Sequence, residues 1–229
     1  MVRRTKEEAL ETRNRILDAA ELIFERHGVS RTSLQQIAQA AHVTRGAIYW
    51  HFKDKAELFE AMMERATMPM EALFQPFEAT ELDPLAFLEK RLVTMLRITA
   101  ASPQIRRAFD IATHKVEYVD ELLVVRDRRI AGRNECLGEC EEILKAAMRL
   151  GQIESAVPVR SLAVGLHALM DGLMQNWMLD SDAFDLVRTG RQVARTYLDG
   201  MRVARKAPVA ATRRRAALGG RRRGLTLQG

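Results

Sequence analysis

Cationic and aromatic side chains are concentrated between residues 44 and 55 of the chain. This segment carries Arg45, Tyr49, Trp50, His51, Lys53 and Lys55. A small protein rarely leaves two adjacent aromatic residues and several cations exposed on one helix without a partner. Lysine and arginine neutralise phosphates, and an α-helix fits the major groove of duplex DNA. The residue types therefore predict contact with double-stranded DNA.

Two short helices joined by a tight turn are predicted to position these side chains. Ser33 followed three residues later by Gln36 has the form of a capping box, which starts the first helix. Thr44 can cap the second helix, residues 44–51. The turn between them carries His42 at a position where glycine is common. A residue other than glycine rarely adopts positive φ, although histidine is among the tolerated types, so we expect slight strain there.

The residues around the second helix are expected to take two roles on DNA. Thr44 and Arg45 approach base edges, where arginine suits guanine, and Gly46 lets the helix backbone come close. A second group is expected to hold phosphates and set the register, and it comprises Thr32, Ser33, Tyr49, Trp50, His51, Lys53 and Lys55. For Tyr49 and Trp50 the alternative is packing within a small domain. For His51 it is a helix end that only caps carbonyl groups.

The amino-terminal quarter resembles the TetR family of transcriptional regulators, and in particular its efflux-pump repressors of the AcrR and TtgR type. The resemblance rests on RTKEEALETRNRILDAAELIFERHG and TSLQQIAQAAHVTRGAIYWHFKDKAELF, most sharply on TRGAIYWHF and KAEL. It implies an all-α, TetR-like fold with a three-helix DNA-binding domain and a larger helical ligand-binding and dimerisation domain. It also implies a homodimeric repressor on a near-palindromic operator, which controls a multidrug efflux pump and is released by small hydrophobic or aromatic compounds.

Composition leads to the same fold class. The 229 residues include 6 prolines and 13 glycines, and long stretches have helical periodicity without strand-like alternation, so an all-α protein is predicted. Two cysteines argue against a disulfide framework and favour a reducing cytoplasm. No apolar run reaches the roughly 18 residues of a membrane span, and the amino terminus lacks the apolar region of a signal peptide.

The net charge of +6 belongs to the end of the chain. Residues 201–229 hold nine arginines or lysines and no acidic residue, which leaves 27 basic and 30 acidic residues elsewhere. We expect three parts: a helix-turn-helix domain over 1–54, a helical ligand-binding and dimerisation domain over 55–204, and a disordered basic tail over 205–229. The tail either adds nonspecific attraction to DNA or is a solvated extension.

Apolar spacing and helix-capping residues predict the order of the elements. Helices are expected over 6–27, 33–40 and 44–51, followed by longer ones opened by Asp54, Pro84, Pro103, Glu117, Pro158 and Asp182. The helix from Glu117 would extend to Leu150, roughly 50 Å, and the last would reach Ala204. Pro69 predicts a kink or break in the fourth helix.

A second group of residues is typical of a ligand cavity within the central helices. Its members are Leu92, Met95, Phe109, Thr113, Cys136, Cys140, His167, Met170, Asp171 and Met174. Methionine suits an adaptable cavity, and a buried Asp171 or His167 would orient a polar or cationic group. Similarity to TtgR-like repressors implies the same positions. Ordinary core packing is the alternative for each of these residues.

The last two helices are predicted to supply the dimer interface, because one helix-turn-helix offers few contacts for tight, specific DNA binding. The apolar stripes are Leu162, Leu166, Leu169 and Leu173, with Leu186, Val193, Tyr197 and Leu198. Monomer core is the alternative for these stripes.

The motifs of common enzymes and metal sites are missing from the sequence. Cys136 and Cys140 have no histidine at ligand spacing, and the chain has no HExxH, GxSxG, GxxxxGK[ST] or GxGxxG motif. We therefore expect no enzymatic activity, no metal and no cofactor. The rival functions are a TetR-like regulator of a metabolic or lipid gene, a DNA-architectural protein without an effector, and an all-α enzyme.

Overall fold

The computed structural model of the protein describes residues 6–71, 76–78 and 80–202. Within these residues the chain forms nine α-helices and one short 3-10 helix. They are α1 (Lys6–His27), α2 (Leu34–Ala40), α3 (Arg45–His51), α4 (Lys55–Glu71), α5 (Pro84–Ala101), α6 (Pro103–His114), η1 (Asp120–Leu122), α7 (Leu123–Arg149), α8 (Val159–Leu179) and α9 (Leu186–Met201). The described part contains no strand, only an isolated antiparallel bridge between Ile153 and Arg202, so the all-α prediction is confirmed.

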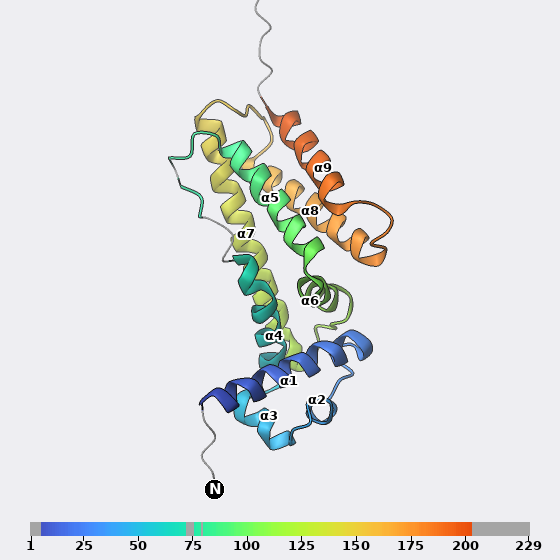
Figure 1. Cartoon of the computed structure of the whole chain (residues 1–229). Helices are drawn as coiled ribbons and strands as arrows, with labels where there is room; N and C mark the ends of the chain where they lie inside the picture. Colours follow the sequence, from blue (N-terminus) through green and yellow to red (C-terminus); the bar gives the residue numbers. More distant parts are fainter. Residues whose placement is uncertain (1–5, 72–75, 79, 203–229) are drawn as a thin grey trace, which may run out of the picture.

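The first three helices form a small body at one end of an elongated molecule, and α4 leads away from it (Figure 1). Phe24 of α1, Ile37 of α2 and Ile48 of α3 are fully buried between them. The same apolar core continues into α4, α6, η1 and the start of α7. The small body is therefore packed onto the rest of the chain rather than attached by a linker.

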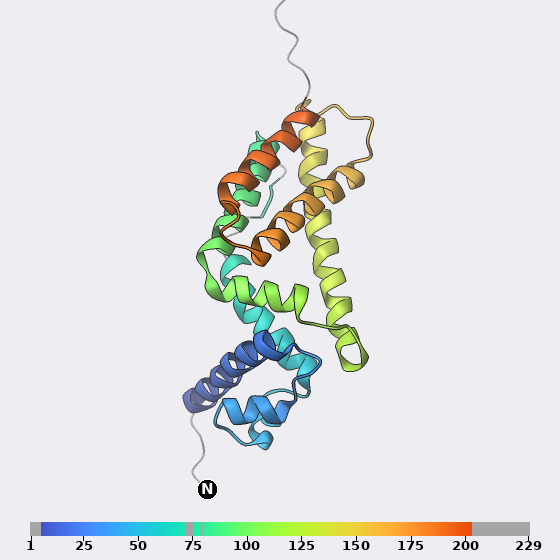
Figure 2. The same ribbon diagram turned by 90° about the vertical axis from the view of Figure 1, so that its right-hand side faces the viewer.

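A second core lies at the opposite end, among α5, α7, α8 and α9 (Figures 1 and 2). Leu96 of α5, Leu144 of α7 and Ala163 of α8 are fully buried there. Helix α6 lies between this bundle and the small body, in contact with both α1 and α8. α6 therefore contacts both cores. In the described part of the chain, none of the helices has the length and apolar character that a membrane span requires.

The predicted caps of the two short helices are present. Gln36 N–H donates to Ser33 Oγ (3.3 Å), and Ser33 N–H donates to Gln36 Oε1 (2.8 Å), which completes the capping box. Ala47 N–H donates to Thr44 Oγ1 at 3.2 Å. His42 has a φ of 54°, which confirms the predicted left-handed turn at a residue other than glycine.

Two predicted helix starts differ from those in the structure. Helix α7 begins at Leu123 rather than Glu117, because Asp120 adopts a φ of 47° and starts the 3-10 turn. Its 27 residues give a length of about 40 Å rather than 50 Å. Helix α9 is capped by Asp185, which accepts from Arg188 N–H at 2.8 Å, and not by Asp182.

One further expectation is tested by the structure, and another falls on residues that the structure does not describe. Helix α4 is not broken at Pro69 but continues to Glu71. Ala204 and the predicted disordered tail, residues 205–229, lie outside the described residues.

Candidate nucleic-acid interface and effector cavity

Helix α3 has one face in the core and one face on the surface. Ile48 is fully buried and Phe52 nearly so, whereas the Trp50 side chain is 72% exposed and Tyr49 48% exposed. The alternative reading, in which the two aromatic residues pack within the small body, is therefore disfavoured. Two adjacent aromatic rings on the surface of a short helix indicate a surface that binds a partner.

Arg45 is held in place by Tyr49, one helical turn further on. Arg45 Nη2 donates to the Tyr49 hydroxyl at 3.0 Å, and the guanidinium carbon lies 5.4 Å from the centre of the tyrosine ring. Such a cation–π contact is worth about 0.5–1 kcal/mol at an exposed site. The two contacts orient the Arg45 side chain along the outer face of α3.

Gly46 has open space on its outer side. A Cβ atom placed there would meet only Thr44 Oγ1, at 3.8 Å, which is an ordinary contact. The protein's own packing does not require glycine at this position. The small residue instead permits another molecule to approach the backbone of α3.

A hollow of about 440 Å³ lies beside this face, and much of its lining is polar or charged. Its lining residues are Ser30, Arg31, Thr32, Ser33, Leu34, Arg45, Tyr49, Lys53, Asp54, Lys55 and Glu121. Arg31 is a residue that the sequence analysis missed. A cation two residues before the Ser33 cap could have been noticed, since it lies next to the start of α2. Arg31, Arg45 and Lys53 are exposed and surround a space that suits a phosphate group.

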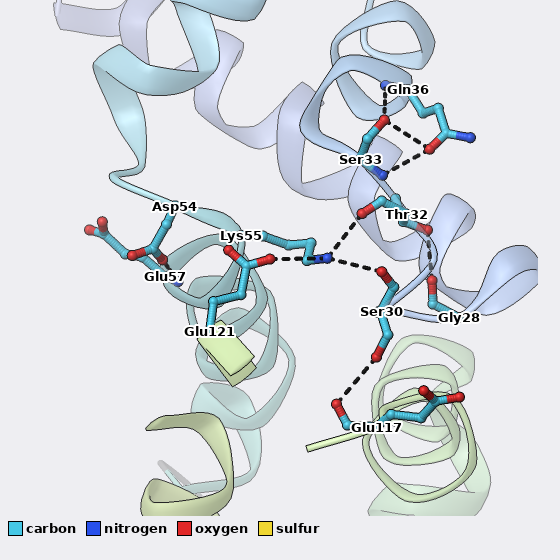
Figure 3. Close-up of polar contacts among 10 residues, drawn as sticks. All are labelled: Gly28, Ser30, Thr32, Ser33, Gln36, Asp54, Lys55, Glu57, Glu117 and Glu121. Atoms are coloured by element: carbon cyan, nitrogen blue, oxygen red, sulfur yellow. Dashed lines mark hydrogen bonds and ion pairs between the residues drawn. The ribbon is translucent and has the colours of Figure 1, made fainter. Parts of the chain in front are cut away.

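Thr32 and Lys55 line the hollow, but their polar groups are turned into the protein. Thr32 is buried, and its hydroxyl donates to the carbonyl oxygen of Gly28 at 2.7 Å (Figure 3). Lys55 is also buried, and its ammonium group contacts the Ser30 and Thr32 carbonyl oxygens and Glu121. The predicted phosphate contacts of these two side chains are therefore corrected to supporting roles.

The other predicted DNA contacts lie on the same surface as Arg45. Ser33, Thr44 and Lys53 are exposed, and the first two hydroxyl groups also cap α2 and α3. His51 is half-buried, with its ring 4.5 Å from the Trp50 ring in an edge-on contact. The contact with His51 orients Trp50 on the surface.

A cavity of about 490 Å³ lies between α5, α7 and α8. Its lining residues lie between Leu88 and Met174, well after α3 in the sequence. Eight of the ten predicted ligand residues line it: Leu92, Met95, Cys136, Cys140, His167, Met170, Asp171 and Met174. Sequence analysis missed eight others: Leu88, Arg91, Gly132, Glu135, Leu137, Glu139, Ile143 and Leu166. Most of these lie three or four residues before or after a predicted residue, which is the pattern that could have found them.

Phe109 and Thr113 do not line this cavity. Both are on α6, whereas the cavity is enclosed by α5, α7 and α8. The Thr113 hydroxyl instead accepts from Arg129 Nη2 at 3.4 Å. Their predicted place in the cavity is corrected, because a sequence pattern shows which residues share a helix face but not which helices enclose a space.

The cavity wall combines apolar side chains with several charged ones. Asp171 Oδ2 accepts from Gln175 Nε2 at 2.5 Å, and Arg91 pairs with Glu139. Burial raises the pKa of the Cys140 thiol to about 12, with a further contribution from the neighbouring Cys136. The thiol is therefore protonated at neutral pH and acts as a small apolar group. Within the described residues, no group of three or more histidine, cysteine, aspartate or glutamate side chains could hold a metal ion.

The predicted dimer stripes belong largely to the core of one protomer. Leu162, Leu166, Leu186 and Leu198 are buried, and the Tyr197 hydroxyl donates to the Leu162 carbonyl oxygen at 2.9 Å. Val193 and Leu173 are half-buried. The large apolar residues of α8 that are exposed are Val164, Leu169 and Leu179. Of the predicted stripe on α8, only Leu169 lies on this open face, because α7 and α9 pack against the rest of the helix.

Comparison with known proteins identifies the class to which this fold and these surfaces belong. Residues 16–62 match the family model described as bacterial regulatory proteins, tetR family. Residues 83–203 match the model described as MAATS-type transcriptional repressor, C-terminal region. The chain is 39% identical over 205 residues to the probable HTH-type transcriptional regulator ArpR of Pseudomonas putida, covering 89% of this chain and 98% of that protein.

Solved structures agree with the sequence comparison. NalD, the secondary repressor of the MexAB-OprM multidrug efflux pump in Pseudomonas aeruginosa, has a TM-score of 0.78 and 32% identity, covering 86% of this chain and 98% of its own. SmeT is the repressor of the Stenotrophomonas maltophilia multidrug efflux pump SmeDEF. The structure of its triclosan complex has a TM-score of 0.74 and 30% identity, covering 84% of this chain and 92% of its own. The protein therefore belongs to the TetR family, whose members are transcriptional regulators and not enzymes.

Proposed function

We propose that this protein is a dimeric transcriptional repressor that binds a near-palindromic operator and is released from it by a small hydrophobic or aromatic compound. The observation that carries the proposal is the outer face of α3, where Arg45 is ordered by Tyr49 beside an exposed Trp50. This face is separated from a cavity of about 490 Å³ in the distal bundle. One molecule thus combines a DNA-reading surface with a compartment for an effector.

DNA recognition divides between base edges and phosphates. Arg45 at the start of α3 reaches base edges in the major groove, where its guanidinium suits guanine. Arg31, Ser33 and Lys53 line the hollow. This supports a role for them in holding the sugar-phosphate backbone and setting the register. Tyr49 and Trp50 pack against the backbone from the same face.

Two copies of α3 are required for tight, specific binding, since a single helix-turn-helix makes few contacts. The exposed Val164, Leu169 and Leu179 of α8 supply an apolar face on which a second copy packs. The two α3 helices then lie one helical turn of DNA apart, which requires an operator with two-fold symmetry.

The effector enters the cavity between α5, α7 and α8. Methionines 95, 170 and 174 give its wall an adaptable apolar surface, and Asp171 and His167 supply polar groups that orient the compound. A compound that binds more tightly to a conformation with the wrong α3 spacing shifts the population away from the DNA-bound state. The similarity to NalD and SmeT favours a multidrug efflux pump as the regulated gene.

The proposal is tested by selecting bound fragments from random duplex DNA, followed by a screen of compounds for release. We expect enrichment of a near-palindromic site, and release by aromatic or hydrophobic antibiotics, with triclosan as the first probe. Enrichment of no sequence would reject the repressor proposal in favour of an architectural DNA-binding protein. Release by fatty acyl compounds but not by aromatic ones would favour a regulator of lipid metabolism.

A further inference from the structure

The ammonium group of Lys55 joins three separate segments of the chain. It donates to the carbonyl oxygens of Ser30 (3.2 Å) and Thr32 (3.1 Å) and lies 3.2 Å from Glu121 Oε1 (Figure 3). A lysine ammonium group has three N–H donors, so these acceptors satisfy it completely. We call these contacts the Lys55 latch. It ties the start of α4 to the loop before α2 and to η1.

The position of Lys55 in α4 is unfavourable for a cation. It is the first residue of α4, where the helix dipole presents partial positive charge. The side chain is also nearly buried, and an unpaired ammonium group would lose its hydration there. The two carbonyl oxygens and Glu121 offset both the unfavourable helix dipole and the lost hydration of the ammonium group. A residue placed against local preference in this way indicates a contact that the tertiary structure requires.

The loop on either side of the latch is docked on the segment between α6 and α7. Val29 N–H donates to the Lys115 carbonyl oxygen at 2.8 Å, and the Ser30 hydroxyl donates to the Glu117 carbonyl oxygen at 3.2 Å. Gly28 comes so close to Lys115 that an added Cβ would lie 3.2 Å from its carbonyl oxygen. Residues 28–32 and 115–121 therefore form one hydrogen-bonded unit.

This unit is directly connected to the DNA-reading helices. Thr32 precedes Ser33, whose side chain caps α2, and Lys55 follows α3 by four residues. On the other side, Glu121 belongs to η1, which leads into α7, and α7 carries Cys136 and Cys140 of the cavity wall. A displacement of the α7 start thus moves the segment that Lys55 holds.

From this geometry, and resting on the proposed repressor function, we propose that Lys55 and Glu121 are positioning residues that fix the orientation of the DNA-binding domain relative to α7. In the dimer they set the spacing between the two α3 helices. They do not contact DNA. Their role is to make the protein select an operator with the correct distance between half-sites, and to pass an effector-induced shift of α7 to α3.

The test compares Glu121→Gln with Glu117→Gln in the full-length dimer. The second variant removes the same charge from the same segment but leaves the Glu117 main-chain carbonyl, which is the group that binds Ser30, in place. The affinity of each protein is measured for the selected operator and for operators with two base pairs added or removed between half-sites. The free energy of unfolding of each variant is measured in urea.

We expect Glu121→Gln to reduce the ratio of affinities for correct and altered spacing by about 3- to 10-fold. Glu117→Gln should keep the wild-type ratio. The triclosan concentration needed for half-release should rise in the first variant only, with unchanged triclosan affinity. Lys55→Met should act in the same direction as Glu121→Gln. If Lys55→Met fails to fold, Glu121→Gln still tests the proposal, because the Glu121 side chain is half exposed and its substitution should not prevent folding.

Two results would overturn the proposal while leaving the repressor function intact. One is a wild-type spacing ratio in Glu121→Gln, even if that variant is less stable, since this would make the contact merely structural. The other is an equal loss in Glu117→Gln, which would assign the effect to charge alone. A wild-type protein that binds all spacings and random DNA equally would instead reject the proposed function itself.

Discussion

Arg107 Nη1 of α6 lies 2.6 Å from Oε1 of Glu21, a carboxylate on α1 that is almost fully buried. The other carboxylate oxygen of Glu21 lies 3.3 Å from Arg65 Nη2 of α4. One acidic side chain of α1 thereby joins this helix to both α4 and α6. The hydrogen bond to Glu21 is the main reason why the pKa of the Arg107 guanidinium is raised, so the guanidinium stays charged.

Glu21→Gln is expected to destabilise the protein by about 1–3 kcal/mol, because two arginines would lose the buried carboxylate that neutralises them. The loss falls below that of a fully buried pair, since the Arg65 and Arg107 side chains remain 20% and 31% exposed. Urea unfolding measures the change. Glu25→Gln is the matched control, because Glu25 pairs with the same Arg107 from a more exposed position. Equal effects of the two variants would contradict the special role of Glu21.

Arg45→Ala is expected to weaken binding to the selected operator by about 1–3 kcal/mol while changing the affinity for random DNA much less. The reason is that the proposed mode of binding assigns base edges to Arg45 and phosphates to Lys53 and Arg31. Lys53→Ala should therefore weaken operator and random DNA to a similar extent and reduce the salt dependence of binding. Fluorescence anisotropy at several salt concentrations separates the two patterns. Parallel losses for Arg45→Ala on both DNAs would show that it does not read bases.

Trp50→Ala is expected to change the free energy of unfolding by less than about 0.5 kcal/mol, because the indole is 72% exposed. Operator affinity should nevertheless fall, since the ring is on the face that we propose to meet DNA. Ile48→Ala provides the contrast within the same helix. Ile48 is fully buried, and its truncation should cost about 2–5 kcal/mol. A large loss of stability in Trp50→Ala would place the indole in the protein's own packing instead.

Local sequence patterns predict helix caps and turns correctly where the contacts that form them lie within a few residues of one another. The Ser33–Gln36 capping box, the Thr44 cap and the left-handed His42 each depend on neighbours in the chain, and each was predicted. The ninth helix shows the limit of this reasoning. Both Asp182 and Asp185 can cap a helix, and only the fold selects Asp185.

Contacts between segments that are distant in the chain could not be predicted from the sequence. Lys55 reads as one more cation beside α3, yet it is withdrawn from the surface by carbonyl groups 23 and 25 residues away and by Glu121. Phe109 and Thr113 have the residue types of a cavity wall, but α6 does not border the cavity. In both cases the residue type was consistent with the prediction, and the packing of helices decided the outcome.

The Cys140 thiol gives a pH-dependent prediction for the cavity. Its pKa of about 12 means that roughly one molecule in 10,000 carries the thiolate at pH 8, so alkylation by iodoacetamide should be about 1,000-fold slower than for a free thiol. The rate should rise about tenfold for each pH unit while the fold persists. Because the folded-state pKa lies above the unfolded value, the stabilising contribution is complete below about pH 9 and is lost as the pH rises towards 12.

Digestion after glutamate separates Cys136 from Cys140, because Glu139 lies between them, so mass spectrometry of the alkylated protein measures Cys140 by itself. Cys140→Ser identifies its peptide, and protein unfolded in urea provides the reference rate for an unprotected thiol. Triclosan should slow alkylation of Cys140 further if it occupies the cavity, because the thiol belongs to the wall. Alkylation of Cys140 in the folded protein at the rate seen in urea would show that the thiol is open to solvent, and the effector site would then have to lie elsewhere.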